Sequence, residues 1–295
     1  MRVLARVTLF KALGAVLEVL PERVDLSLAK LVARVAQRVA PQTRRDLRAN
    51  LEHILSPPAT TTSAALVNRF ADRALASYGQ YWAESAKLPA IDPSAIAARF
   101  CISEGLEHLM ESKERGTGLV IALPHMGSWE WGGAFLAQIG LPMTAVAEVL
   151  NPPALFEWFK AKRESIGIQI EPLNEHAGAV LLATLKRGGV VGLLCDRDIQ
   201  RNGIEVDFFG ERVTIPAGPA TLALRTGATL VAAACYSGPG RDHHAVVSAP
   251  IEVVRQGRLR DDVTRITQVV AHELEGLIQR APEQWHVLEP RFARP

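Results

Sequence analysis

The sequence is poor in the residues that define several common classes of protein. Only three of its 295 residues are cysteines, Cys101, Cys195 and Cys235, and they form no Cys-x-x-Cys pair. This spacing argues against a disulfide framework and favours buried, inert thiols in a reducing compartment. Aromatic residues make up 6% of the chain and the formal net charge is +2. The sequence therefore lacks the basic surface and the stacking platforms of a protein that binds nucleic acid.

Two catalytic signatures are missing as well. No pair of histidines has the helical spacing of zinc hydrolases, and Ser128 does not lie in a Gly-x-Ser-x-Gly elbow. We therefore expect no metal centre and no serine nucleophile.

The N-terminus has no apolar run long enough to cross a bilayer. Charged residues interrupt residues 3–20, and Pro21 ends the run short of the roughly 20 apolar residues that a span requires. No convincing signal-peptidase site follows, so we expect no secretion signal. We predict amphipathic helices within residues 1–55, packed on or near the membrane-facing side. Arg34 and Arg38 on the helix predicted for residues 25–40 either attract anionic lipid or belong to a solvated face.

The most informative segment is residues 124–130. It follows a short apolar run, residues 119–123, that is typical of a strand buried on both faces. A helix is expected next, with Ser128 as the N-cap whose hydroxyl accepts from the amides of the first turn. His125 is therefore expected on the loop and Glu130 in the first turn of the helix.

This histidine and this carboxylate have a chemical use. Because a turn separates them, His125 can fold back over the helix start, where Glu130 accepts a hydrogen bond from one ring nitrogen and leaves the other as a general base. The alternative is structural, with a loop histidine that caps the helix and an acid that the helix dipole favours there. The backbone amides near Gly127 and Ser128 are candidate donors to an oxyanion.

From residue 100 onward, strand and helix patterns alternate, which is typical of an open, mainly parallel sheet flanked by helices on both faces. Strands are expected at residues 119–123, 144–149, 190–194, 229–235 and 246–253. Helices are expected at residues 63–87, 129–138, 153–166, 177–187, 219–225 and 261–280. We predict a single α/β domain over residues 1–295 that includes the N-terminal helices.

The carboxyl ends of parallel strands meet at one edge of a sheet, so residues that follow different strands are expected close together. His125 follows one predicted strand, Glu148 lies near the end of the next, and residues 196–198 follow a third. The charged side chains expected at this edge either pair with one another, which we favour, or contact a phosphate. They are Glu148, Arg163, Asp196, Arg197 and Asp198.

The pattern His125-x4-Glu130 resembles the His-x4-Asp/Glu signature of the lipid A biosynthesis acyltransferase superfamily. Further blocks at residues 196–198, 206–210, 215–220 and 282–286 follow in the order and at the approximate spacing of that family. The glutamate of the signature and the Asp-Phe-Phe-Gly block are most similar to the phosphatidylinositol mannoside acyltransferases. Phe208 and Phe209 of that block are expected to shape or pack against a pocket rather than to react.

The resemblance implies a glycerolipid-acyltransferase-like domain with His125 and Glu130 as its catalytic pair. It implies transfer of a long-chain acyl group from acyl-CoA, with palmitoyl-CoA as the expected donor, to a mannose hydroxyl of a phosphatidylinositol mannoside. No cofactor beyond this co-substrate and no acyl-enzyme is expected. The expected location is the cytoplasmic face of the plasma membrane, with peripheral or monotopic attachment to an anionic surface.

Two alternatives stay open. One is a lipid A type or other glycolipid acyltransferase that uses acyl carrier protein, although such enzymes commonly have the clean N-terminal anchor that we do not find here. The other is a catalytically inactive lipid-binding homologue on the same scaffold. Hydrophobic residues make up 48% and charged residues 22% of the chain, which fits a protein that works at a membrane surface.

Overall fold

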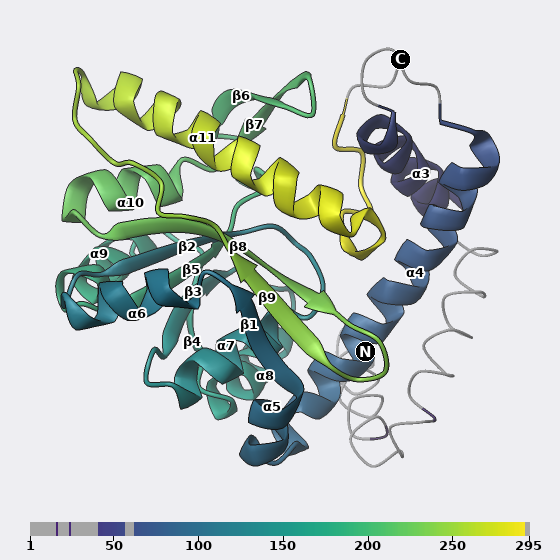
Figure 1. Ribbon diagram of the computed structural model, residues 1–295, viewed down its shortest axis with the longest axis horizontal. Helices are drawn as coiled ribbons and strands as arrows, with labels where there is room; N and C mark the ends of the chain where they lie inside the picture. Colours follow the sequence, from purple (N-terminus) through teal and green to yellow (C-terminus); the bar gives the residue numbers. More distant parts are fainter. Residues whose placement is uncertain (1–15, 17–23, 25–40, 57–61, 293–295) are drawn as a thin grey trace.

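The computed structural model describes residues 16, 24, 41–56 and 62–292 (Figure 1). The helices predicted for residues 3–20 and 25–40 therefore lie outside the described residues. Helix α3 (Pro41–Leu55) packs against α4 (Ala64–Lys87), whose N-cap Ser63 accepts a hydrogen bond from an amide of the first turn. No helix within the described ranges is long and apolar enough to cross a membrane.

A seven-stranded sheet forms the centre of the domain, in the order β1-β9-β8-β2-β5-β3-β4. All neighbouring strands are parallel except β8 and β9, which are antiparallel. The mainly parallel sheet that the sequence predicts is therefore confirmed. Its strands are β1 (Phe100–Glu104), β2 (Leu119–Leu123), β3 (Met143–Ala147), β4 (Gln169–Pro172), β5 (Val190–Leu194), β8 (Thr229–Ser237) and β9 (His243–Val247).

Helices cover both faces of this sheet (Figure 1). Alternate residues of a strand point to opposite faces, and all five residues of β2 are buried. Val120 and Ala122 join the core under α9, α10 and α11, whereas Ile121 joins the core over α6, α7 and α8. The helices are α5 (Pro93–Arg99), α6 (Leu106–Glu114), α7 (Trp129–Gln138), α8 (Pro153–Ser165), α9 (Ala177–Lys186), α10 (Gly218–Thr226) and α11 (Leu259–Arg280).

The sequence predicted the buried elements better than the edges. The bounds of β2, β5 and α7 agree with the prediction, but the last strand spans His243–Val247 rather than residues 246–253. Pro250 lacks an N–H group and interrupts the ladder, and beyond it Ile251 pairs with Leu230 only as an isolated bridge. The prediction also missed β1, β4, α6 and an antiparallel hairpin of β6 (Ile204–Phe208) and β7 (Glu211–Ile215), which packs on α11 outside the main sheet.

Candidate active site

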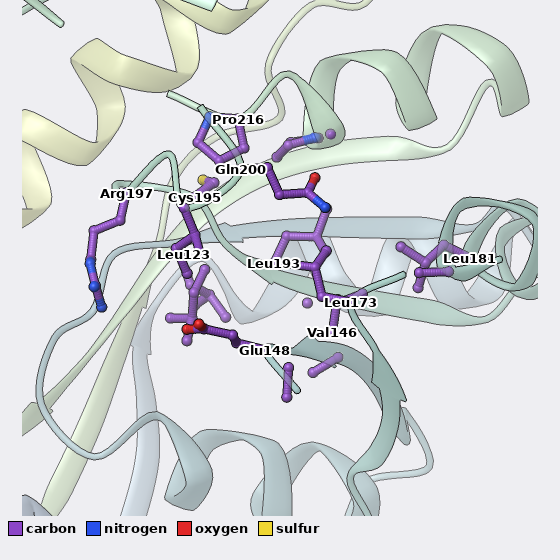
Figure 2. Close-up of a pocket in the computed structure, with 18 of the residues that line it drawn as sticks. Leu123, Val146, Glu148, Leu173, Leu181, Leu193, Cys195, Arg197, Gln200 and Pro216 are labelled. Carbon is purple, nitrogen blue, oxygen red and sulfur yellow. The ribbon is translucent and has the colours of Figure 1, made fainter. Parts of the chain in front are cut away.

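A pocket of about 640 Å³ opens at the carboxyl edge of β2, β3 and β5, and most of its wall is apolar. This volume lies within the range of sites that enclose small ligands, roughly 300–1,000 Å³. Figure 2 shows Val146, Leu173 and Leu193 between Arg197 on one side of the pocket and Leu181 on the other. His125 also lines the pocket, together with Glu148, Arg163 and Asp198 from the predicted set.

The pairing of two parallel strands brings His125 to Asp196. Leu123 at the end of β2 lies in register with Leu194 at the end of β5, so the residues two positions further on arrive at the same edge. The His125 amide donates to Oδ2 of Asp196 at 2.9 Å, and Nδ1 of the His125 ring lies 2.5 Å from Oδ1. Both the main chain and the ring of this histidine are therefore fixed by one carboxylate.

Asp196 is fully buried, yet it is held as a carboxylate. Burial alone raises its pKa, but the His125 charge and hydrogen bonds from His125 and the Trp285 indole outweigh burial and lower the pKa below its usual value. A carboxylate can only accept, so Nδ1 of His125 must carry the proton. This leaves Nε2 unprotonated in the neutral ring, as a general base requires.

The predicted hydrogen bond between His125 and Glu130 is wrong. Oε1 of Glu130 instead accepts from the Tyr81 hydroxyl at 3.0 Å and from the Arg163 guanidinium at 3.2 Å. The reason is the turn before α7, where Gly127 has a φ of 53° and directs the helix start toward α4 and α8. The catalytic role of Glu130 stays a prediction, but it does not rest on contact with His125.

Ser128 also makes a different contact from the one expected. It is the N-cap of α7, but its side chain accepts no hydrogen bond from the first turn. Its hydroxyl donates to the Glu84 carboxylate on α4 instead. Burial raises the pKa of Glu84 and outweighs the hydrogen bonds from Ser128 and Gln80, which lower it. The contact ties α4 to the loop that carries His125.

One of the two candidate oxyanion amides is already engaged. The Gly127 amide donates to the Gln284 carbonyl at 3.0 Å. A Cβ at this position would lie 2.0 Å from the Cys235 carbonyl oxygen, so only glycine fits. The Gly127 amide is therefore part of the scaffold and not a donor to substrate.

Neither predicted arginine pairs with Glu148, Asp196 or Asp198. Arg163 binds Glu130 and lies 5.0 Å from the centre of the Trp129 ring, whereas Nε of Arg197 lies 2.6 Å from Glu289. The Glu130 and Tyr81 charges outweigh burial and raise the pKa of Arg163, which stays cationic at the pocket wall. The mutual pairing expected among residues 196–198 is wrong, because each side chain finds a partner elsewhere. Asp198 accepts from the amides of the loop that follows it, Asn202 and Gly203.

Phe208 and Phe209 do not line the pocket. Phe208 is fully buried at the end of β6, and its ring packs with those of Phe209, Trp285 and Phe292. The antiparallel hairpin carries both residues to the α11 side of the core. The two phenylalanines therefore do not form the pocket wall. They belong to the core that packs around Trp285, the residue that binds Asp196.

The prediction missed Trp285 and His286 as site residues. Nε1 of Trp285 donates to Oδ2 of Asp196 at 2.7 Å, and the His286 amide donates to the His125 carbonyl at 2.7 Å. Burial, followed by the His125 charge, lowers the pKa of His286 to about 3. The block at residues 282–286 belongs to the family resemblance, but no spacing in the sequence relates it to His125.

Comparisons with known proteins show which sequences the chain is similar to. The family model described as bacterial lipid A biosynthesis acyltransferase matches residues 2–294. The chain is 35% identical to the phosphatidylinositol mannoside acyltransferase of Mycolicibacterium smegmatis over 84% of this chain and 79% of the relative. It is 37% identical to the protein of that name from Mycobacterium tuberculosis, over 84% of this chain and 76% of the relative. A lipid A biosynthesis acyltransferase of Haemophilus influenzae is 25% identical over 61% of this chain and 55% of the relative.

Proposed function

Because the chain belongs to the bacterial lipid A biosynthesis acyltransferase family, we propose that this acyltransferase moves a long-chain acyl group from acyl-CoA to a mannose hydroxyl of a phosphatidylinositol mannoside. The acceptor class follows the names of the two mycobacterial relatives, which match most of both chains. One observation carries the chemistry: a histidine with Nδ1 on a buried carboxylate lies in the wall of a largely apolar pocket.

The His125 ring supplies what acyl transfer to an alcohol lacks. A thioester is already reactive, whereas a neutral sugar hydroxyl is a poor nucleophile. Nε2 of His125 takes the hydroxyl proton as the oxygen forms a bond to the thioester carbonyl carbon. Collapse of the tetrahedral intermediate breaks the carbon–sulfur bond, and the proton passes from the imidazolium to the leaving thiolate, which gives the ester and CoA. Asp196 holds the imidazolium while it exists.

The apolar wall supports a fatty acyl chain as the transferred group. Leu173, Leu181 and Leu193 line it, and Leu181 lies on the side of the pocket away from Arg197 (Figure 2). Arg163 and Arg197 also line the pocket, and a guanidinium can bind a phosphate of the donor or of the inositol lipid. In this proposal Glu130 positions Arg163 and Tyr81 at the wall.

The donor, the acceptor and the base are tested together. Purified protein is assayed with palmitoyl-CoA or palmitoyl acyl carrier protein, and with phosphatidylinositol mannosides or lipid A precursors. We expect the first of each pair to be preferred, and His125→Ala to lower kcat about 10²- to 10⁴-fold. Undiminished transfer by His125→Ala would refute the base. A preference for acyl carrier protein and lipid A precursors would assign the chain to the other branch, and no transfer at all would point to a lipid-binding homologue.

The location is proposed from the substrate, since a glycolipid acceptor resides in a membrane. We propose peripheral or monotopic attachment at the cytoplasmic face of the plasma membrane, with contact to anionic lipid. Flotation of the intact protein with anionic liposomes at low salt tests the attachment, with neutral liposomes as the control. Equal recovery in the soluble fraction with both would contradict it.

A further inference from the structure

The segment 284–286 forms a short antiparallel bridge with the loop that carries His125. Met126 pairs with Trp285 as an isolated bridge. The Gly127 amide donates to the Gln284 carbonyl at 3.0 Å, and the His286 amide donates to the His125 carbonyl at 2.7 Å. These are main-chain contacts, so they persist when the Trp285 side chain is changed.

The Trp285 side chain adds a contact of a different kind. Its exposed fraction is 0%, and Nε1 donates to Oδ2 of Asp196 at 2.7 Å. The same oxygen accepts from the His125 amide at 2.9 Å, while Oδ1 faces Nδ1 of the His125 ring. The indole N–H therefore restrains the rotation of the carboxylate through the oxygen that does not face the histidine ring.

We propose that Trp285 is a positioning residue for acyl transfer, whose indole N–H holds the Asp196 carboxylate in the orientation that directs Nε2 of His125 toward the pocket. The proposal rests on the proposed function, because it requires His125 to be the base. Trp285 does not line the pocket. It therefore acts through Asp196 and not on the substrate.

The other titratable groups beside this pair keep one charge state across neutral pH. His286 is neutral, since burial and then the His125 charge lower its pKa to about 3. Burial, and then the Asp196 charge, raises the pKa of the Cys195 thiol, so this neighbour is neutral too. Burial lowers the pKa of Arg291, which the Asp196 and Asp198 charges oppose, and a guanidinium stays charged in proteins. A change in pH dependence therefore reports the His125–Asp196 pair.

The chain contains a matched control for removal of one indole N–H. Trp131 on α7 is 1% exposed, as buried as Trp285, but its Nε1 has no hydrogen-bond partner in the described part of the chain. Trp285→Phe and Trp131→Phe remove similar volume from the core. Only the first removes a hydrogen bond to Asp196.

We expect Trp285→Phe to lower kcat about tenfold to a hundredfold, since a small misplacement of a base is costly, and to leave KM unchanged. The acid limb of the kcat/KM profile moves to higher pH, because a carboxylate that has lost a donor holds the imidazolium form more strongly. Trp131→Phe is expected to keep the wild-type pH profile and kcat. A merely structural role for Trp285 predicts lower thermal stability with no shift of the acid limb.

Two results would overturn the proposal. One is a folded Trp285→Phe protein with the wild-type kcat and pH profile, and the other is the same shift in both variants. If Trp285→Phe does not fold, benzothienylalanine at position 285 keeps the shape of the ring and replaces N–H by sulfur, and the same criteria apply. If His125→Ala is inactive while the Trp285 variant behaves as wild type, the base stands and only the positioning role fails.

Discussion

The two carboxylates beside the His125 loop have contrasting surroundings. Both oxygens of Asp196 are engaged, by the His125 ring, the His125 amide and the Trp285 indole. Glu130 is nearly as buried, but Oε1 takes both of its contacts, and Oε2 has no hydrogen-bond partner among the described residues. A buried polar atom without a hydrogen-bond partner lowers stability, so stability alone does not explain the position of the Glu130 carboxylate.

The contrast continues along α7. Trp131 Nε1 and both ring nitrogens of His243, which stacks on Trp131 at 4.3 Å between ring centres, are also buried without a hydrogen-bond partner in the described ranges. The strand ends at β2 and β5, by contrast, form a closed hydrogen-bond network with the 284–286 segment. We infer that the contacts of Asp196 fix the orientation of the His125 ring. Glu130, by contrast, keeps one oxygen free to accept a hydrogen bond next to Arg163, which lines the pocket.

The largest expected effect is that of Asp196→Asn. The amide keeps the shape of the side chain but cannot hold an imidazolium, and it can favour the wrong tautomer of His125, so kcat is expected to fall about 10³- to 10⁴-fold. Steady-state kinetics with saturating donor and acceptor measure this.

Asp262→Asn is the matched control, because Asp262 is another buried carboxylate, which binds Arg265 at the start of α11. That variant is expected to lose thermal stability and to keep kcat. Equal losses of kcat in the two variants would show that Asp196 has no specific role in catalysis, because loss of another buried carboxylate would have the same effect.

A smaller effect is expected from Glu130→Gln, which removes the charge beside Arg163 and keeps the volume. The loss of a charge-assisted contact predicts a decrease in kcat/KM of about tenfold to a hundredfold. The acid limb of the pH profile should stay in place, because Glu130 does not contact the His125 ring. A shift of that limb in Glu130→Gln would break the contrast between the two carboxylates.

The sequence predicted the strand ends of the site but not which side chains meet there. Buried parallel strands give continuous apolar runs, so the sequence predicts β2 and β5 correctly. These two strands also define the edge of the sheet at which His125 and Asp196 lie. The partner of His125 was not readable, because it depends on register between strands that are 71 positions apart. A carboxylate five positions away was the nearer candidate, and the turn at Gly127 directs it elsewhere.

The contributions of the C-terminal segment were beyond single-sequence reasoning for a related reason. Trp285 lies 89 positions from Asp196, and a tryptophan in a loop has no periodicity that reports its partner. The prediction missed the β6–β7 hairpin although both strands alternate exposed and buried residues, which is the pattern of half-buried strands. Contacts between residues far apart in the sequence are determined by tertiary packing, so local sequence patterns do not predict them.

The next expected effect concerns the apolar end of the pocket, which neither carboxylate contacts. Leu181 on α9 lies across the pocket from Arg197 (Figure 2). Leu181→Trp fills part of the cavity and is expected to lower kcat/KM for palmitoyl-CoA about tenfold relative to a shorter acyl-CoA, since lost burial of a few methylenes is worth about 1–3 kcal/mol. Competition between the two donors measures the ratio. Leu181→Ala should move the preference toward longer chains, and a uniform loss with every donor would instead mean a general disruption of the site.

The smallest expected effect concerns His243, whose buried ring nitrogens have no hydrogen-bond partner among the described residues. It is measured as a change in the pH dependence of stability. Burial, followed by the Arg99 and His244 charges, lowers the pKa of His243 to about 3, and Glu84 faces its ring at 3.7 Å. Below about pH 6.5 His243 is protonated in the unfolded chain but stays neutral in the folded chain. As the pH falls from about 6.5 toward 3, His243 therefore lowers the free energy of unfolding by about 1.4 kcal/mol per pH unit. His243→Phe keeps the stack on Trp131 and removes this pH-dependent loss of stability. Denaturant unfolding at pH 7 and pH 5 should show a smaller loss of stability in the variant, and an unchanged loss would mean that His243 is protonated in the folded protein.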